Sequence, residues 1–529
     1  MLPCARTSIT AGSLFTGRIC ASSLALLSYL GAAALTSYVA QPAVAQMVAD
    51  SNTVVAAGLA APGIPGATIV SLSTPSINSV GTFVIVGTLT GGSITPANNQ
   101  AMWMVTPSSI FLVLQTGSSV VGGLPTGITV STIESPTVNA NGTIAFLTSL
   151  QGPAVTGANT RAVIAGPSGA LQLIARASNP PPGLATTLRF NSFSGPRLGV
   201  GNLVVFNASI AGQEPNAQGV LRPMNGDSGA TMWAGQVGSP MSLVMRSGIA
   251  GNVPGIPTAR FANFGDANVS EQGILTFHGA LILQSPIVTS TTDMVIIRGP
   301  VGGFQTVARA GMSVPFLVGS QAARLDGINP VSANGDNEFA FTGTVTPSPT
   351  TSSSFMTFRV ANNQWYPLVQ TGWIVEPGIQ VGTVSSPRCS GQSNVLMLST
   401  LLGSRVGPAN DQTIWASIPA GLFEIARKGN QAPGCLPGVT FAGFSSYGMN
   451  AVGTAAFLCT LSGPLVTPQN DTALVTWNAV DGLRLIGRKG GAYEVTTDDF
   501  RTISGIVCNL DGGAEDGRPC SLSSNGLLA

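Results

Sequence analysis

An apolar run that follows a short polar turn recurs along the chain. The stretch "NANGTIAF" ends at Phe146, and "NAVGTAAF" ends at Phe457. Degenerate copies, such as "SEQGILTF" and "NGDNEFAF", end at Ile85, Phe206, Phe277, Phe341 and Leu398. The period is about 60–70 residues, which is the scale of one supersecondary unit in a repeat protein.

Two further patterns recur in phase with this one. A run ending in Arg-x-Gly or its equivalent appears as "LVMRSG", "TVARAG" and "IARKG", usually followed by Pro and Gly. A run of the type "DQTIWAS" follows the apolar run. Each unit therefore predicts four short strands: the Arg-x-Gly strand, a strand leading into the turn, the "TIAF" strand and the "IWAS" strand.

The polar turn has a physical reason. Asn and Gly tolerate a positive φ, which tight hairpins require, and the apolar residues after the turn are predicted to pack the core of the unit. The predicted turn residues are Asn78, Gly81, Asn139, Gly142, Gly273, Asn334, Asn450 and Gly453. The predicted packing residues are Phe146, Phe206, Phe277, Phe341 and Phe457.

Four-stranded units repeated at this period favour an all-β fold, a β-propeller of seven to eight four-stranded blades. Tandem β-sandwiches would need about seven strands per unit, and a β-helix would need a much shorter period. The predicted domain covers residues 46–529, with seven full repeats and a partial eighth.

The ends of this domain leave two interpretations open. The stretch "SSNGLLA" (residues 523–529) reads as the start of an eighth copy, and "NTVVAAG" (residues 52–58) reads as an unpaired strand of the Arg-x-Gly type. Either the two ends complete a shared blade and close the ring, which removes exposed sheet edges, or the reading frame is truncated inside a strand.

Composition agrees with many strands and turns. Only 8% of the 529 residues are charged, against about 25% in an average soluble protein. Gly (66) and Pro (36) are abundant, which disfavours long helices. The net charge is +1 without a basic stripe, so nucleic acid is not expected as a partner.

The N-terminal segment, residues 1–45, is predicted to be a signal-peptide helix. The apolar stretch "CASSLALLSYLGAAALTSYVA" precedes Ala43-Val44-Ala45, a small-x-small cleavage pattern. The protein is therefore predicted to be exported, either secreted or held at the cell surface. The alternative is an uncleaved membrane anchor, because the stretch is long enough to span a bilayer.

Five cysteines follow the predicted signal segment, namely Cys389, Cys435, Cys459, Cys508 and Cys520. After export they would face an oxidising compartment. Cys508 and Cys520 flank one loop and are the first candidates for a disulfide, and Cys435 with Cys459 or Cys389 is a weaker pairing. The odd count leaves one thiol over, and the lack of Cys-x-x-Cys argues against zinc.

The motif Asn-x-x-Gly-x-x-Ala-Phe, complete at Asn139–Phe146 and Asn450–Phe457, resembles the signature of a family of bacterial secreted tandem-repeat proteins named for their variable C-terminal anchors. The resemblance covers nearly all of the chain after the signal segment, in degenerate form. It implies no defined activity and no catalytic residues. The chain stops before any apolar anchoring tail of the kind that this family often carries.

Candidate chemistry is sparse. His278 is the only histidine, and a strand or rim position is expected for it, because catalysis also needs a positioned partner. Asp336 and Glu338 alternate onto one strand face, but a solvated rim is expected. The acidic stretches "TTDDF" (496–500, with Asp498 and Asp499) and "NLDGGAEDG" (509–517, with Asp511, Glu515 and Asp516) could bind Ca²⁺. They lack EF-hand spacing, and such loops are most often solvated turns.

The arginines of the Arg-x-Gly strands recur at equivalent positions. They are Arg176, Arg246, Arg309, Arg427 and Arg488. A ring of guanidinium groups could bind an anionic ligand. Hydrogen bonding to loop carbonyls is the favoured interpretation, because a repeated residue in a repeat fold usually serves the repeat.

Three functions follow as hypotheses. The first is a secreted, non-catalytic β-propeller that binds an extracellular ligand or surface partner, or acts as a scaffold. The second is a secreted polysaccharide hydrolase or lyase with two carboxylates on the channel face. The third is a structural cell-surface protein. The first is favoured, because the residue types needed for catalysis are rare.

Overall fold

The computed structural model describes residues 55–529 except 216–219, 225–228, 315–322, 335–337, 348–352, 386, 497 and 512–516. Within these residues the chain forms strands, turns and loops, and none of them builds a helix that could cross a membrane. The predicted signal-peptide helix, residues 1–45, lies outside the described residues.

Seven antiparallel sheets of four to six strands follow one another along the chain. Blade 1 contains β1 (Thr68–Leu72), β2 (Ser76–Ile77), β3 (Phe83–Thr90), β4 (Gln100–Thr106) and β5 (Ser109–Gln115). Blade 2 contains β6 (Thr129–Val130), β7 (Glu134–Val138), β8 (Thr143–Gln151), β9 (Arg161–Pro167) and β10 (Gln172–Arg176). Blade 3 contains β11 (Leu188–Phe193), β12 (Arg197–Leu198), β13 (Leu203–Pro215), β14 (Leu221–Pro223), β15 (Ala230–Gln236) and β16 (Ser242–Arg246).

The remaining blades repeat this order. Blade 4 contains β17 (Phe261–Phe264), β18 (Asn268–Val269), β19 (Leu275–Leu281), β20 (Met294–Gly299) and β21 (Gln305–Arg309). Blade 5 contains β22 (Ser313–Val314), β23 (Ala323–Ile328), β24 (Ser332–Ala333), β25 (Glu338–Pro347), β26 (Ser354–Ala361) and β27 (Gln364–Gln370). Blade 6 contains β28 (Ile374–Glu376), β29 (Ile379–Val384), β30 (Arg388–Ser390), β31 (Asn394–Leu402), β32 (Gln412–Ile418) and β33 (Gly421–Arg427). Blade 7 contains β34 (Thr440–Met449), β35 (Ala455–Ser462), β36 (Thr472–Asn478) and β37 (Gly482–Arg488), and a separate hairpin follows, β38 (Ala492–Thr496) with β39 (Asp499–Thr502).

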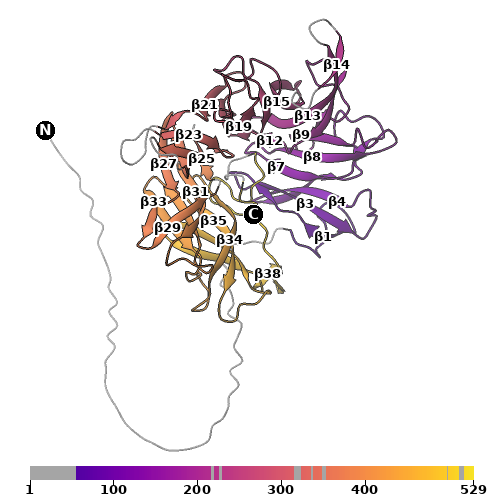
Figure 1. The fold of residues 1–529 in the computed structure, drawn as a ribbon. Helices are drawn as coiled ribbons and strands as arrows, with labels where there is room; N and C mark the ends of the chain where they lie inside the picture. Colours follow the sequence, from indigo (N-terminus) through magenta and orange to yellow (C-terminus); the bar gives the residue numbers. More distant parts are fainter. Residues whose placement is uncertain are drawn as a thin grey trace, which may run out of the picture. The chain divides into compact units, whose positions relative to one another are not determined.

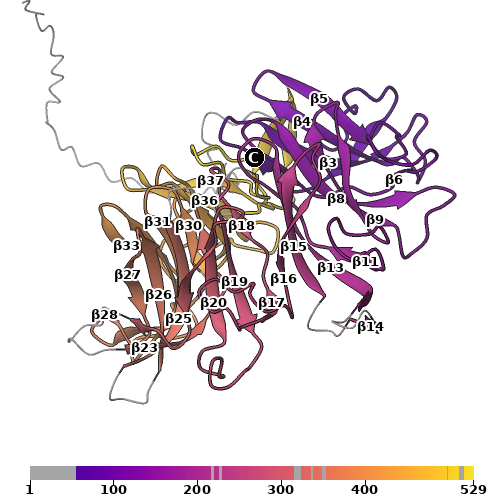
Figure 2. The same cartoon turned by 90° about the horizontal axis from the view of Figure 1, so that it is seen from above.

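The seven sheets form a ring. The short strands β2, β7, β12, β18, β24, β30 and β34 contact one another in this order, so they are the innermost strands around the axis. Figure 1 shows the sheets following one another around the ring from indigo to yellow, with the C-terminus near its middle. Figure 2 shows the strands of one blade side by side, for example β25, β26 and β27. The prediction of an all-β propeller is confirmed, and the number of blades is seven.

The boundaries of the blades differ from those of the sequence repeat. The Arg-x-Gly strand is the outermost strand of each blade and belongs with the three strands before it, as β37 belongs with β34–β36. Blade 7 therefore needs no strand from the N-terminus. The described part of the "NTVVAAG" stretch, residues 55–58, forms a bend and a turn, so a blade shared through that strand is not what closes the ring.

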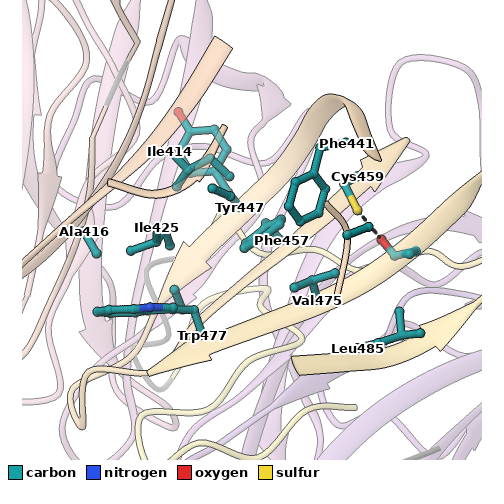
Figure 3. Packing of buried hydrophobic residues seen from close by; sticks show 14 of the residues in the cluster. Ile414, Ala416, Ile425, Phe441, Tyr447, Phe457, Cys459, Val475, Trp477 and Leu485 are labelled. Atoms are coloured by element: carbon teal, nitrogen blue, oxygen red, sulfur yellow. Dashed lines mark hydrogen bonds between the residues drawn. The ribbon is translucent and has the colours of Figure 1, made fainter. Parts of the chain in front are cut away.

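The phenylalanine of the repeat packs between neighbouring blades. Phe457 on β35 is fully buried and lies against Phe441 and Phe444, with ring centroids 6.1 and 5.6 Å away. The same cluster includes Ile414 and Ala416 of blade 6 (Figure 3). Burying one such ring contributes about 2–3 kcal/mol, and this contribution is repeated from one blade interface to the next.

A three-residue break divides the innermost strand of most blades. In blades 1 and 3 a serine hydroxyl accepts the backbone N–H of the neighbouring strand at this break. In blade 1, Ser73 donates its N–H to Val86 O (2.7 Å) while its Oγ accepts the N–H of Val86 (3.1 Å). Ser194 and Asn207 repeat this pair in blade 3. A buried N–H without a hydrogen-bond partner would lower the stability of the fold. The serine side chain that accepts this N–H at the break therefore stabilises the bend.

The side-chain oxygen of the turn asparagine accepts hydrogen bonds from backbone N–H groups of its own turn. Asn139 Oδ1 accepts the N–H groups of Asn141 (3.1 Å) and Thr143 (3.0 Å), and Gly142 has φ 75°. Asn450 makes the equivalent bond to the N–H of Thr454, and in blade 4 the hydroxyl of Ser270 takes the same place. The glycines Gly81, Gly273 and Gly453 have φ between 79° and 82°.

The NH₂ groups of several asparagine side chains donate hydrogen bonds to backbone carbonyls of the next blade. Asn78 Nδ2 donates to Asn139 O (2.8 Å), Asn139 Nδ2 donates to Gly199 O (3.1 Å) and Gly201 O (2.7 Å), and Asn394 Nδ2 donates to Asn450 O (3.1 Å). Asn334 donates in the same way to Ser390 O, and Asn525 donates to Ser79 O. We call these five side chains (Asn78, Asn139, Asn334, Asn394 and Asn525) the amide belt.

The amide belt predicts the effect of removing one member. Asn139→Ala leaves two N–H groups and the carbonyl of Gly199 without this partner, and Gly201 O keeps only the longer bond from Asn141 Nδ2 (3.4 Å). The free energy of unfolding should therefore fall by about 2–4 kcal/mol. Urea denaturation followed by tryptophan fluorescence measures this change. The matched control is Asn430→Ala, an exposed turn residue outside the amide belt, which should matter by less than about 0.5 kcal/mol. Equal midpoints for the two variants would contradict a structural role for the belt.

Candidate functional site at the ring axis

The C-terminal part of the chain occupies the axis of the ring. We call residues 509–511 and 517–523 the axial segment. It contacts the inner strand of every blade through hydrogen bonds or an ion pair. These contacts are with Ser76 and Ile77 (blade 1), Val138 (blade 2), Leu198 (blade 3), Val269 (blade 4), Ala333 (blade 5), Arg388 (blade 6) and Ser446 (blade 7).

Gly517 and Arg518 are the centre of this arrangement. Gly517 donates its N–H to Val138 O (3.0 Å) and accepts the N–H of Leu198 (2.8 Å). The Arg518 side chain is 2% exposed and donates to Val269 O (3.0 Å) and Ala333 O (2.8 Å). One guanidinium therefore joins blades 4 and 5, while its own backbone carbonyl accepts Ser76 Oγ–H (3.1 Å) from blade 1.

The axial region carries positive charge. Burial lowers the pKa of Arg197, the Asp266 carboxylate acts in the opposite direction, and the nearby Arg518 adds to the lowering. At blade 6, Arg388 forms an ion pair with Asp511 (Nη2–Oδ1 2.8 Å) and lies over the ring of Tyr447 at 5.3 Å. Burial raises the pKa of the Tyr447 phenol, so this hydroxyl stays protonated near neutral pH.

A hollow of 430 Å³ lies beside the axial segment, between blades 1 and 2. Its walls come from the strand breaks of these two blades and from Asn509 and Pro519 of the axial segment. A second hollow of 620 Å³ lies on β13 and β15, but its lining includes Met224 and Gly229, which flank residues 225–228 outside the described part. The first hollow is therefore the candidate binding site.

Most carboxylates of the described chain are paired with cations. Arg161 holds Glu134 with two hydrogen bonds (2.7 and 2.8 Å), and Arg246 holds Glu214 in the same way (2.8 and 2.6 Å). The other acidic residues in ion pairs are Asp326, Glu376, Asp411, Glu424, Asp471, Asp481, Asp499 and Asp511. Glu338, expected on a solvated rim, is instead buried and accepts Ser393 Oγ–H, and Asp336 lies outside the described residues.

The recurring arginines serve the loops beside the outer strands. Arg176, Arg309 and Arg488 each donate Nε–H to a loop carbonyl, at Asn159 (2.8 Å), Thr292 (3.0 Å) and Asn470 (2.7 Å) respectively. Arg246 and Arg427 pair with carboxylates. These contacts match the structural interpretation of the repeat, since the guanidinium groups bond to the chain itself.

The remaining candidate residues, the histidine and the acidic stretches, do not lie together at one site. His278 is half-buried on β19, and burial lowers its pKa. In the acidic stretches, Asp499 pairs with Arg501 and Asp511 pairs with Arg388, while Glu515 and Asp516 lie outside the described residues. Within the described ranges, no group of three or more His, Cys, Asp or Glu side chains is arranged to hold a metal ion.

The cysteines fall into three neighbourhoods, and Cys389 lies in the cluster between blades 5 and 6. Cys508 and Cys520 pack in one apolar cluster with Leu510 and Leu522, close enough for each to influence the other, and burial raises the pKa of Cys508 to about 11. Cys435 and Cys459 share the cluster between blades 6 and 7. The predicted Cys508–Cys520 disulfide stays a prediction.

Sequence reasoning missed the residues of the axis. Arg518 and Gly517 lie in an insertion that matches no repeat, so no periodic signal marks them. Asn525 lies in the stretch "SSNGLLA", and its bond to Ser79 O joins the C-terminal turn to blade 1. Spacing along the chain carries no information about which turns meet at the axis.

Comparison with known proteins identifies a family but no activity. The profile of a family of unknown function, DUF7453, matches twice, over residues 35–315 and 283–529. No curated protein matches the chain in sequence.

Solved structures with a similar arrangement are distant. They include the acylaminoacyl peptidase of Pyrococcus horikoshii (9% identity, TM-score 0.37, 79% of this chain and 52% of that one). An oligogalacturonate lyase in complex with manganese (9%, 0.36, 81% and 88%) and the WD40 domain of SCAP from fission yeast (9%, 0.33, 79% and 86%) are also similar. This chain spans about half the length of the peptidase chain. At these values the likenesses carry no argument about function.

The fit of Gly517 generates a prediction about the axial segment. A Cβ at this position would lie 2.2 Å from Leu198 O, and the residue has φ 75°, so Gly517→Ala cannot keep the present backbone. Thermolysin should cleave the C-terminal part of this variant about tenfold faster or more, because local opening becomes easier. Cleavage rates come from mass spectrometry of timed digests.

The control for this experiment lies in the same part of the chain. A Cβ at Gly505 would meet no atom within 4 Å, so Gly505→Ala should be cleaved at the rate of the unaltered protein. Equal cleavage of both variants at the unaltered rate would mean that residues 517 and 198 are not in contact.

The bidentate pairs predict a pH dependence of stability. The hydrogen bonds from Arg161 hold the pKa of Glu134 below its ordinary value of 4.5. A carboxyl with a lowered folded pKa stabilises the fold above its unfolded pKa, and this stability is lost as pH falls through the folded value. The unaltered protein should thus exceed Glu134→Gln by up to about 1 kcal/mol at pH 7, and the difference should shrink in acid. Urea midpoints at several pH values measure it.

The partner of the pair provides the second variant. Arg161→Gln should lose the same pH-dependent part of the stability, because either change removes the pair. A stability difference that stays constant from neutral pH down through the acid range would contradict the assignment.

Proposed function

We propose that this chain, which belongs to the DUF7453 family of β-propellers of unknown function, is a non-catalytic binding or scaffold module that works outside the cell. The observation that carries the proposal is the axial segment. The chain's own residues fill the axis and bond to all seven blades, so the axis serves closure of the ring.

The use of the carboxylates supports the same proposal. Glycoside-cleaving enzymes need two carboxyl groups that face one cleft at a defined separation. Here Glu134, Glu214 and Asp511 each accept bonds from an arginine of the same or a neighbouring blade. Side chains engaged in this way stabilise blades and are poorly available for acid–base chemistry.

Work outside the cell is the part of the proposal that rests on sequence. The apolar N-terminal stretch with Ala43-Val44-Ala45 supports export. The low content of charge and the many neutral polar residues fit a surface that works through hydrogen bonding. A structural role at the cell surface is compatible with the same features.

A polysaccharide-cleaving enzyme is the second candidate, and the place to test it is a pair of carboxylates on blade 6. Arg427 contacts both Glu376 (Nη1–Oε1 3.2 Å) and Glu424 (Nη2–Oε2 2.8 Å), so two carboxylates meet at one guanidinium. The guanidinium takes up the hydrogen-bonding positions that a substrate oxygen would need. This arrangement favours a rigid link between β28 and β33 over catalysis.

Incubation of the purified chain with neutral and anionic polysaccharides decides between the two candidates. We expect no new reducing ends and no ultraviolet absorbance from unsaturated products above the protein-free background. Product formation that disappears in Glu424→Gln, and persists in the control Glu494→Gln on the exposed face of β38, would replace the proposal with the enzyme.

A further inference from the structure

The hollow between blades 1 and 2 is built from parts that are far apart in the sequence. Residues near position 73 come from the break in blade 1, residues near 135 come from the break in blade 2, and Asn509 and Pro519 come from the axial segment. Its volume of 430 Å³ is in the range of sites that hold small ligands. Closure of the ring therefore also completes this hollow.

Two amide groups in the lining keep a donor available. Gln100 uses Oε1 to accept the N–H of Ile133 (3.0 Å), and Asn509 uses Oδ1 to accept the N–H of Asp511 (3.2 Å). No hydrogen bond from Gln100 Nε2 or Asn509 Nδ2 occurs among the described residues. Because a backbone N–H holds the oxygen of each amide in place, the position of the NH₂ group is fixed as well.

Hydroxyl groups add acceptors and donors beside these amides. Ser71 Oγ and Thr88 Oγ1 lie 2.6 Å apart and share one hydrogen bond, so lone pairs remain for a ligand. The exposed Ser135 lies on the rim of the hollow with φ 49°. A non-glycine residue in this region is uncommon and costs about 1–3 kcal/mol, and such residues gather at ligand sites.

The rest of the lining is uncharged and combines further hydroxyl groups with apolar residues. Pro75, Pro136 and Pro519 supply rigid C–H surfaces, and Ile133 also belongs to the lining. No charged side chain belongs to the lining within the described part of the chain. An ionic ligand would lose its hydration here without a countercharge, so the hollow selects against it.

We propose that this hollow binds a neutral carbohydrate unit. A sugar ring presents alternating hydroxyl groups and C–H faces. Its hydroxyl groups match the fixed amide donors and the hydroxyls of the hollow, and its C–H faces match the proline side chains. The proposal rests on the proposed function as a binding module and names its ligand class. Without an aromatic stacking platform in the lining, the affinity belongs in the weak range, with Kd of about 10 µM to 10 mM.

The test is calorimetry and ligand-observed NMR on the full chain with neutral glucose, mannose, galactose and xylose oligosaccharides. Oligogalacturonate is the charged comparison. At least one neutral series should bind, and oligogalacturonate should bind more weakly. Gln100→Glu keeps the acceptor for Ile133 and replaces the Nε2 donor with a charged oxygen, so it should weaken binding about tenfold or more. The matched control is Gln364→Glu at the exposed start of β27, which should bind as before.

A second variant guards against a folding defect. Ser135→Gly removes one hydroxyl at a positive φ that glycine accepts readily, and it should weaken binding about three- to tenfold, the worth of one neutral hydrogen bond. Ser178→Gly makes the same change at another positive-φ serine, away from the hollow, and should leave binding unchanged.

The possible outcomes distinguish a failure of the carbohydrate-site proposal from a failure of the proposed function. If no neutral series binds the folded chain, or if the control variants weaken binding as much as the hollow variants, the hollow is not a carbohydrate site and the binding-module proposal stands. If an oligosaccharide binds in the hollow and is cleaved, the non-catalytic proposal fails while the site remains.

Discussion

The pairing of backbone groups around the ring axis is the constraint on which the rest of the structure depends. Seven inner strands approach one another there, each interrupted or short, and their N–H and C=O groups are shielded from water. Such groups must find partners, because an unpaired buried amide costs about 1–3 kcal/mol. The protein meets this need with neutral side chains: the amide belt at the turns, serines at the strand breaks and the axial segment along the axis.

This solution accounts for the composition. A chain with 8% charged residues cannot hold its blades together with ion-pair networks, and partly exposed pairs would contribute little. Asparagine suits the turns because its two ends act separately. Oδ1 of Asn139 caps its own turn while Nδ2 bonds to blade 3. Charged side chains also take part, and the guanidinium of Arg518 spans two blades because it can donate to several carbonyls at once.

The sequence predicts the repeating parts of this structure and misses the parts that do not repeat. The period, the Asn/Gly turns and the apolar strand after them gave the propeller, because turn chemistry and alternating burial are local properties. The Arg-x-Gly strand was predicted as the first strand of each unit, but it is the last strand of each blade, and spacing alone does not decide this because a ring can be divided at any strand. Val55–Gly58 read as a strand, but in the structure these residues form a bend and a turn. The axial segment and the hollow depend on contacts between residues about 440 positions apart, such as Ser76 with Arg518, and no spacing rule encodes those contacts.

Amide hydrogen exchange of the unaltered protein, resolved to single residues in the C-terminal part, tests the central claim most directly. The account states that the axial segment is an integral part of the ring core. It predicts that the N–H groups of Leu510, Gly517 and Ser521, which donate to Ser446 Oγ, Val138 O and Asn509 O, exchange as slowly as those of β35, the second strand of blade 7. Exchange at the rate of an open loop, with β35 still protected, would contradict the account.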